Sequence, residues 1–382
     1  MSEVDTVTRV NVRLLDKEYP IACPPDQRDA LLESAAYLNS TMREIRDAGK
    51  VVGTDRIAVM AALNLAKKLP SSTDPCGATS YALQYIVARP SNILRACKDE
   101  QIDEYLIPTI RGERVDCMAM SEPDAGSDVR GMKCSAVRDG DDYVINGTKH
   151  FISHADLADY VILFVATGEE QTSKGPKKKI TGFLVDFDTP GCEVVHGYNC
   201  VSNRGYHNLI INFDNCRVPV RNILGEEHRG FDAANEWLGS TRLQVAAVCV
   251  GRARRALGIA TEWAATRVQF GQQIGKFQGV SFKLADMRTR LEAAELLTLR
   301  AAWLDSQGKA LDEDMAMAKV FSSEMCQFVT HEAIQILGGM GLMDELPLER
   351  MWRDTRVDRI WDGTSEIQRH IISRAMLRPY GA

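Results

Sequence analysis

The chain has 382 residues, of which 45% are hydrophobic and 26% are charged, a composition typical of a folded globular protein. Its 46 basic and 52 acidic residues leave a formal net charge of −6, which provides no electrostatic basis for binding nucleic acid or an anionic membrane. The longest uncharged stretch, residues 75–88, contains Ser, Thr and Gln and is too short for a membrane-spanning helix, which needs about 20 apolar residues.

The N-terminus and the cysteines indicate a cytoplasmic protein. The first ten residues carry acidic side chains and no apolar stretch, so no signal peptide is expected. The ten cysteines are scattered, and no two form a C-x-x-C pair. In a chain of this length, that pattern indicates reduced thiols rather than disulfides or a zinc site.

Residues 1–69 are predicted to form a separate ββαα module. Residues 10–14 alternate apolar and polar side chains, as in a half-buried strand, and 19–23 is predicted to be the return strand. A helix follows over 24–48, with apolar residues spaced three or four apart. A second helix, at 57–66, is nearly apolar all round and is expected to be buried or to lie in an interface.

This module resembles the head of the cell-division protein ZapA over about residues 8–68. The stretches that carry the resemblance are LLDKEY, MREIRDAGK and TDRIAVMAALN. The resemblance implies a head that dimerises and contacts filaments of the tubulin-like protein FtsZ. In that family a C-terminal coiled coil makes tetramers, but here a linker rich in Pro and Ser, at 70–79, stands where the coiled coil would continue.

Residues 80–382 follow an α–β–α order. Residues 80–114 are expected to be helical, with one helix from 93 to 107 that Pro108 ends. Residues 115–225 contain closely spaced strand-like runs and predict a central antiparallel sandwich or barrel. These runs are Tyr143–Ile145, Tyr160–Val165, Gly182–Val185 and Leu209–Phe213. Long helices are expected over 226–382, with a turn at residues 306–308.

Two glycine-containing stretches and one histidine pair are candidate binding sites. MSEPDAGSDV, at 120–129, would expose backbone N–H groups and hydroxyls to a polar ligand, although an ordinary surface turn explains the same composition. GGMG, at 338–341, follows an apolar helix, so a helix C-cap is expected instead of a nucleotide-binding loop. His150 and His154 lack a third ligand nearby, and no metal site is expected.

Two further stretches each allow two interpretations. RVQFG, at 267–271, places a cation, an amide and an aromatic ring beside a glycine, either as a corner between helices or as a diphosphate site. Asp362 precedes Gly363 and a helix that starts near Thr364. A carboxylate at that place is either a capping partner or a base at the edge of a cleft.

Taken in order, five motifs resemble those of the acyl-CoA dehydrogenase family over about residues 80–382. They are EPDAGSD, INGTKHFIS, RVQFGQQIGKFQ, AIQILGGMG and RIWDGTSEIQRHII. The resemblance implies an α+β, acyl-CoA dehydrogenase-like fold with partial N-terminal helices, a central antiparallel β domain and a C-terminal four-helix bundle. It implies FAD as the cofactor and an acyl-CoA as the substrate. It also implies a homo-oligomer, dimer or tetramer, in which each flavin touches two subunits.

The resemblance also implies a role for each matching residue. The flavin or the thioester end of the substrate would be lined by Met118, Ser121 and Ser127, and the flavin ring system by Phe151 and Ser153. The diphosphate and adenine of the flavin of the other subunit would be held by Arg267, Gln269, Phe270, Gln278, Gln335 and Gly339. The flavin of the same subunit would contact Thr364 and Glu366, and the CoA portion of the substrate would contact Arg242.

Asp362 stands at the usual position of the catalytic Glu. In this family a carboxylate removes the α-proton of the thioester while the β-hydrogen leaves as hydride to the flavin. Asp is shorter by one C–C bond, about 1.5 Å, so either it works on a shifted substrate or the enzyme does something other than simple dehydrogenation. We favour the first. Thr241 occupies the position where other branches carry the base and cannot serve, and Glu236 is out of register.

Three functions are therefore open. The first is an FAD-dependent acyl-CoA dehydrogenase with an incidental N-terminal module; its electron acceptor would be an electron-transferring flavoprotein, or oxygen in an oxidase. The second is a division-ring binding module that carries a passenger flavoprotein fragment. The third is an inactive chimera, because the ZapA-like module replaces helices that cover one side of the acyl pocket in this family. We rank them in that order.

Overall fold

The computed structural model describes residues 8–14, 17–23, 28–47, 92–173, 175–205 and 207–381. The chain divides into two compact units, one from residues 1–88 and 243–341 and the other from 89–242 and 342–382. Each unit is described by itself. None of the described helices is both long enough and apolar enough to cross a bilayer.

The described part of the N-terminal module consists of β1 (Thr8–Leu14), β2 (Lys17–Cys23) and α1 (Arg28–Asp47). The strands pair as an antiparallel hairpin, and α1 packs against β1, with Val10 and Met42 buried. The two predicted strands and the first helix are thus confirmed. The second predicted helix, at 57–66, and the linker at 70–79 lie outside the described residues.

The segment before the sheet is a series of short helical pieces: η2 (Asn92–Ala96), η3 (Ile102–Leu106) and α4 (Ile107–Arg111). The prediction that Pro108 ends a single helix is wrong. Pro108 lies in the first turn of α4, which directly follows η3, so the helical path continues through the proline as far as Arg111. The break falls earlier, near Asp99, whose φ of +49° is left-handed.

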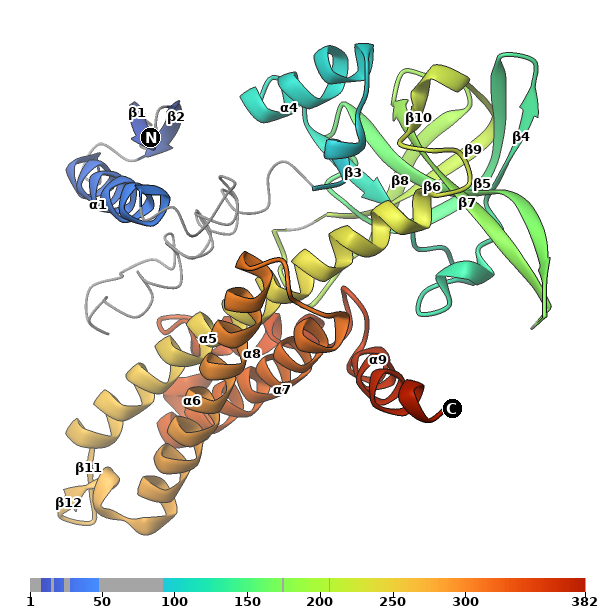
Figure 1. Ribbon diagram of the computed structural model, residues 1–382. Helices are drawn as coiled ribbons and strands as arrows, with labels where there is room; N and C mark the ends of the chain where they lie inside the picture. Colours follow the sequence, from blue (N-terminus) through green and yellow to red (C-terminus); the bar gives the residue numbers. More distant parts are fainter. Residues whose placement is uncertain are drawn as a thin grey trace. The chain divides into compact units, whose positions relative to one another are not determined.

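The central sheet comprises β3 (Asp116–Ala119), β4 (Ser135–Asp139), β5 (Asp142–Ser153), β6 (Tyr160–Thr172), β7 (Gly175–Asp186), β8 (Cys192–Tyr198), β9 (Asn208–Pro219) and β10 (Ile223–Leu224). Its strand order is β10-β7-β6-β4-β5-β9-β8, and β3 pairs in parallel with β6. The curled sheet is drawn in greens in Figure 1. All four strand-like runs of the sequence lie within these strands, so the central β domain is confirmed.

Both faces of this sheet are buried, which explains the uninterrupted apolar run in β6. Val161 and Leu163 join one hydrophobic cluster, while Tyr160, Ile162 and Phe164 join the other. Because neighbouring residues of a strand point to opposite faces, a strand covered on both sides must be apolar throughout.

Arg114 holds the preceding helical segment on the sheet. Its guanidinium lies 4.8 Å from the ring centroids of both Tyr105 and Tyr160 and forms an ion pair with Asp186. The hydroxyl of Thr109, in α4, is 2.7 Å from the Tyr160 hydroxyl. The two tyrosine rings meet edge to face at 4.8 Å, and Arg114 packs against both, so this aromatic cluster and two polar contacts join elements that are far apart in the sequence.

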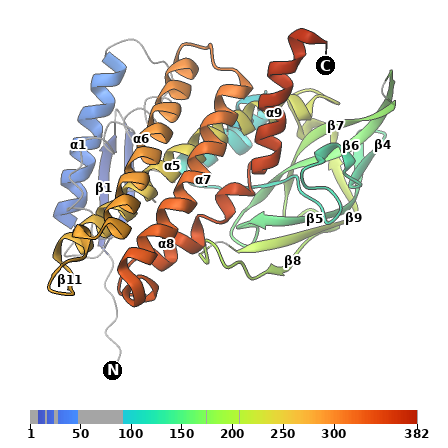
Figure 2. The ribbon, with the colours of Figure 1, turned by 90° about the horizontal axis from the view of Figure 1, so that it is seen from below.

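The C-terminal helices are α5 (Gly230–Thr266), α6 (Gln278–Ser306), α7 (Asp312–Leu337), α8 (Leu348–Asp354) and α9 (Ser365–Leu377). Figure 2 shows α6 and α7 side by side; Arg290 stacks 3.9 Å from the Phe328 ring centroid, and Lys283 pairs with Glu332. The predicted turn is confirmed by Gly308, with φ +65°. Short 3₁₀ turns are η4 (Val129–Gly131), η5 (Val220–Asn222), η6 (Ile274–Lys276), η7 (Gly338–Leu342), η8 (Val357–Arg359) and η9 (Arg378–Tyr380).

Candidate functional site

The loop that follows β3 lies against the end of β5. The carbonyl of Ser121 accepts a hydrogen bond from the backbone N–H of His150 at 3.0 Å. This contact brings the hydroxyl-rich loop beside the segment that contains Phe151, the residue predicted to contact the flavin ring. Met118, on β3, and Ser121 therefore lie near the strand that carries Phe151, and their predicted contact with the flavin stays a prediction.

Phe151 sits in a bulge of β5. The pairing of β5 with β9 is interrupted between Lys149 and Ile152, and Phe151 has φ +56°. Its ring is 55% exposed and lies 3.9 Å from the His150 ring and 5.0 Å from the Tyr198 ring, measured between centroids. A left-handed backbone is costly for a bulky residue, so such strain in a β-bulge is typical of a site where the side chain has a task.

The turn that carries Asp362 is held from inside the protein. Asp362 and Gly363 have φ +52° and +87°, and the buried Gln368 donates its side-chain N–H groups to their carbonyls at 3.0 and 2.8 Å. The predicted start of α9 is confirmed: Thr364 is the N-cap, and its hydroxyl accepts from Ile367 N–H at 3.3 Å.

Three predicted residues of the same unit present polar groups at the surface. They are Ser127, Ser153 and Glu366. Glu366 accepts a hydrogen bond from its own backbone N–H and one from Thr364, and these lower the pKa of its carboxyl.

Arg242 and Thr241 are buried in α5, at 4% and 9% exposure. The Thr241 hydroxyl donates to the Leu238 carbonyl at 3.1 Å, an ordinary bond within a helix. The predicted contact between Arg242 and the CoA portion of the substrate stays a prediction.

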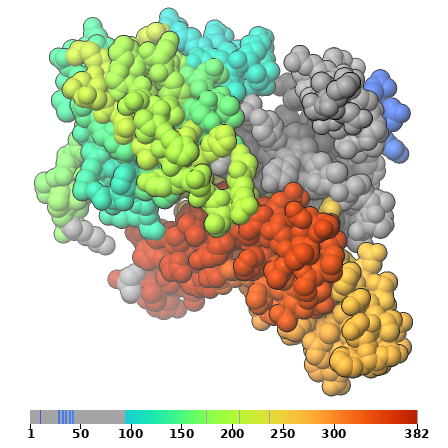
Figure 3. Space-filling model, turned by 180° about the vertical axis from the view of Figure 1, so that it is seen from behind, coloured from blue at the N-terminus to red at the C-terminus, as the bar shows by residue number. Residues whose placement is uncertain are grey.

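The second predicted set lies in the other compact unit. A small hairpin, β11 (Val268–Gln269) and β12 (Gln272–Gln273), joins α5 to α6. Phe270, at its tip, has φ +51° and is 95% exposed. The segment is at the molecular surface in Figure 3, in light orange. Arg267, Gln269, Gln278, Gln335 and Gly339 are also exposed, and Gly338, with φ +61°, forms the expected C-cap of α7.

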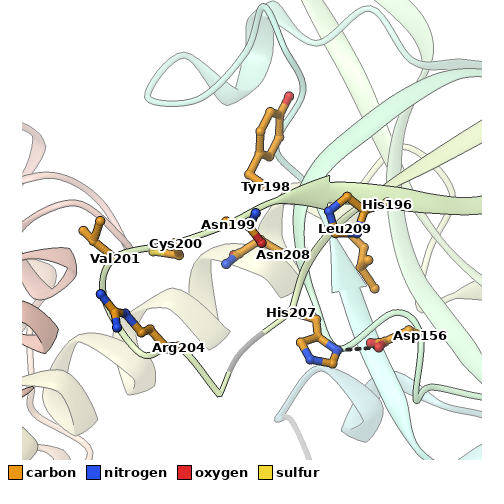
Figure 4. A pocket seen from close by; sticks show the side chains of 10 residues that line it. All are labelled: Asp156, His196, Tyr198, Asn199, Cys200, Val201, Arg204, His207, Asn208 and Leu209. Carbon is orange, nitrogen blue, oxygen red and sulfur yellow. Dashed lines mark hydrogen bonds and ion pairs between the residues drawn. The ribbon is translucent and has the colours of Figure 1, made fainter.

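A surface cavity of about 660 Å³ was not predicted from the sequence (Figure 4). It is lined by Asp156, His196, Tyr198, Asn199, Cys200, Val201, Arg204, His207, Asn208 and Leu209. His207 Nδ1 lies 2.5 Å from Asp156 Oδ2, and this hydrogen bond lowers the pKa of the Asp156 carboxyl. Tyr198 connects the cavity to Phe151 through their ring contact. No short motif marks these residues, because they come from a strand end and a loop.

The loop along this cavity is fixed to α8. The backbone N–H of Asn203 donates to Asp354 Oδ1 at 2.7 Å, and the Ser202 hydroxyl donates to the Arg353 carbonyl at 2.6 Å. Arg353 donates in turn to the Val201 carbonyl at 3.1 Å. Within the described part of the chain, no group of three or more His, Cys, Asp or Glu side chains could hold a metal ion.

The residues predicted for FAD fit that cofactor in their chemistry. The exposed, strained Phe151 and Phe270 offer aromatic faces, and an exposed guanidinium with neighbouring amides offers donors for a diphosphate. These groups, on a curled central sheet and on long C-terminal helices, agree with the class of protein that the motifs indicate, a flavin-dependent enzyme that acts on acyl thioesters.

Comparison with known proteins identifies the same family as the sequence motifs. The acyl-CoA dehydrogenase middle domain matches residues 117–216, and the acyl-CoA dehydrogenase C-terminal domain matches 228–377. The mitochondrial short-chain specific acyl-CoA dehydrogenase of Rattus norvegicus is 38% identical over 288 residues, which cover 75% of this chain and 69% of that protein. The chain therefore belongs to the acyl-CoA dehydrogenase family, as its motifs predict.

Solved structures confirm the fold class. Butyryl-CoA dehydrogenase from Megasphaera elsdenii has a TM-score of 0.74 and 34% identity, covering 85% of this chain and 83% of that one. An FAD complex of PigA has a TM-score of 0.76 and 26% identity, covering 93% and 98%. The cell division protein ZapA matches residues 10–85, which confirms the second resemblance and extends past the expected module boundary at residue 69. The domain boundaries expected at residues 69, 114 and 225 stay predictions.

Proposed function

We propose that this protein is an FAD-dependent acyl-CoA dehydrogenase that introduces an α,β double bond into an acyl-CoA thioester. Membership of the family supports this function. The observation that carries it is the bulge at Phe151, where an exposed aromatic ring is held in a strained conformation beside the loop of Ser121. FAD, when bound, supplies the acceptor for the β-hydride.

The chain's own residues bind the reactants and move the proton. The Asp362 carboxylate accepts the α-proton of the thioester, and the Gln368 side chain fixes the turn from which it acts. Met118, Ser121, Phe151 and Ser153 line the flavin ring system. Thr364 and Glu366 contact the same flavin, and the exposed set around Arg267 binds the flavin of a second subunit.

The cavity beside Tyr198 is suited to the CoA portion of the substrate. Arg204 supplies a permanent positive charge, and Asn199 and Asn208 supply amides, which together match a phosphate-bearing ligand. The ring contact of Tyr198 with Phe151, at 5.0 Å between centroids, brings the edge of the cavity next to the proposed flavin site.

The test is a visible absorbance spectrum of the purified protein, followed by anaerobic addition of acyl-CoA thioesters of increasing chain length. The proposal requires a flavin spectrum near one FAD per chain that the correct thioester bleaches without oxygen. A folded protein that stays colourless after FAD is added would refute it. We further propose a cytoplasmic homo-oligomer with an electron-transferring flavoprotein as acceptor, to be tested by light scattering and by electron transfer assays.

A second function is favoured by the match of residues 10–85 to ZapA. The described hairpin and α1 agree with the strand–strand–helix start expected of that module. We propose that this part contacts FtsZ. Co-sedimentation with FtsZ filaments at fixed salt tests the contact, and failure to pellet above a filament-free control would exclude it.

A further inference from the structure

Lys149 is a completely buried cation outside the set of residues assigned to the reaction. Its side chain is 0% exposed, and its ammonium donates to Glu122 Oε1 at 2.7 Å and to the Met120 carbonyl at 2.9 Å. Taking an ion pair out of water costs several kcal/mol per ion before the pairing is counted. Replacement of both partners by apolar residues is often neutral for stability, so the energy of this pair by itself does not explain its place in the core.

The carboxylate of Glu122 also accepts hydrogen bonds from two backbone N–H groups. It accepts hydrogen bonds from the N–H groups of Lys133 at 2.6 Å and of Cys134 at 3.1 Å. Within the loop, Glu122 and Ala125 exchange both backbone hydrogen bonds. The loop 120–125 is thus closed on itself and fixed through one carboxylate to the chain before β4.

Lys149 is also the last residue of β5 that pairs with β9 before the bulge. The next residue, His150, turns its N–H to the Ser121 carbonyl at 3.0 Å, and Phe151 then takes its left-handed conformation. Three consecutive loop residues, 120–122, therefore each accept a hydrogen bond from Lys149 or His150 of the strand. These contacts between the loop and β5 fix the position of the loop. They also fix the point at which Phe151 leaves the regular strand pairing.

We propose that Lys149 is a positioning residue, which sets the separation between the loop 120–125 and Phe151 through Glu122 and Met120 and so preorganises the flavin site. This inference rests on the proposed binding of FAD. Lys149 acts through other residues, so its removal loosens the site without deleting any group that contacts the flavin.

The test compares Lys149→Met, which keeps most of the aliphatic stem, with Lys133→Met. Lys133 makes an exposed ion pair with Asp124 on the same loop, at 73% and 63% exposure, and its backbone N–H to Glu122 survives the substitution. FAD affinity is measured by fluorescence titration of the apo-protein, and the flavin environment by visible circular dichroism. We expect Lys149→Met to weaken FAD binding about tenfold or more and to change the flavin spectrum, with Lys133→Met close to wild type.

Wild-type affinity and an unchanged flavin spectrum in Lys149→Met would overturn the inference. If the wild-type protein binds no FAD, it is the proposed function that fails. If Lys149→Met does not fold, Glu122→Gln keeps the side-chain volume while turning one acceptor oxygen into a donor. Hydrogen exchange of the wild type provides a measurement without variants: FAD must slow exchange in 119–125 and 147–153 together, and protection of only one segment would overturn the inference.

Discussion

The backbone N–H of Asn203 donates to the carboxylate of Asp354, 151 positions later in the sequence, at 2.7 Å. Both residues are buried, and Asn203 has a left-handed φ of +47°. This bond joins the loop of the proposed CoA cavity to α8, the helix that precedes the Asp362 turn. The loop that lines the cavity and the turn of Asp362 are thereby joined through α8 and a short stretch of chain.

Asp354→Ala is expected to lower stability by about 1–3 kcal/mol, because it leaves a buried N–H without its acceptor. Since the loop lines the cavity, KM for the acyl-CoA should rise more than kcat falls. Asp354→Asn, which keeps an acceptor oxygen, should retain most of both properties. Thermal melting and steady-state kinetics check this expectation, and equal effects of the two substitutions would contradict it.

Asp362→Asn is expected to slow anaerobic flavin bleaching by about 100-fold or more, because the amide cannot accept the α-proton. The FAD content and melting temperature should not change, since Asn tolerates the left-handed backbone as well as Asp does. Stopped-flow absorbance measures the rate. Bleaching of the Asn variant at the wild-type rate would show that another group takes the proton.

Arg204→Gln should raise KM for the acyl-CoA about tenfold with kcat unchanged, because it removes a charge that binds substrate and transition state alike. Arg221→Gln is the matched control. Arg221 is 60% exposed and pairs with Glu100 and Glu104, and it does not line the cavity. An unchanged KM in Arg204→Gln would place the CoA portion elsewhere.

The Glu349–Arg353 ion pair predicts that part of the folding stability is lost at acidic pH. Arg353 donates to the Glu349 carboxylate at 2.7 and 3.0 Å and so lowers the pKa of that carboxyl below its ordinary 4.5. Because the folded-state pKa is depressed, the pair stabilises the fold above about pH 4.5, and the contribution is lost as pH falls through the lower value. The stabilisation should be about 0.5–1 kcal/mol.

Glu349→Gln should therefore melt below the wild type at pH 6, with the difference shrinking towards pH 3. Differential melting across pH 3–7 measures this. Glu113→Gln is the control, because Glu113 is exposed and lies 4.0 Å from Arg111. A melting difference for Glu349→Gln that stayed constant down to pH 3 would contradict the assignment.

Arg114→Met is expected to cost about 2–3 kcal/mol, because it removes the stacking on Tyr105 and Tyr160 and leaves Asp186 without its guanidinium. Arg111→Met, which removes a 65% exposed side chain of the neighbouring helix, should cost less than about 0.5 kcal/mol. Thermal melting distinguishes the two. Equal melting temperatures would mean that the contacts of Arg114 with the two tyrosines and Asp186 add nothing to stability.

Short sequence patterns predicted those strands and helix ends that depend on interactions between residues close together in the sequence. The apolar run of β6, the alternation that predicts a strand at residues 10–14 and the helix start near Thr364 each depend on residues a few positions apart, and the structure confirms the two strands and the helix start. Pro108 was misassigned because proline is both a helix terminator and a favoured first-turn residue, and the sequence pattern does not separate the two.

The missed parts depend on contacts between distant residues. Lys149 lies 27 positions from Glu122, and a lysine in a strand is ordinarily a surface residue, so nothing local marks it as buried. The cavity residues Tyr198 and Arg204 belong to no short motif, and their loop is placed by α8. By contrast, the family motifs located Phe151 and Asp362, although sequence alone gave no indication of their strained backbones.

Three residues predicted to bind or act on the reactants, Phe151, Phe270 and Asp362, share a left-handed backbone that glycine would adopt with less strain. At these positions the predicted role of the side chain and the ease of the backbone conformation make opposite demands on the residue. A lineage released from the need to oxidise thioesters should drift towards glycine or asparagine there, at no loss to the fold. The amino acids that closely related chains carry at 151, 270 and 362 would thus record how long the chemistry has been retained in each lineage.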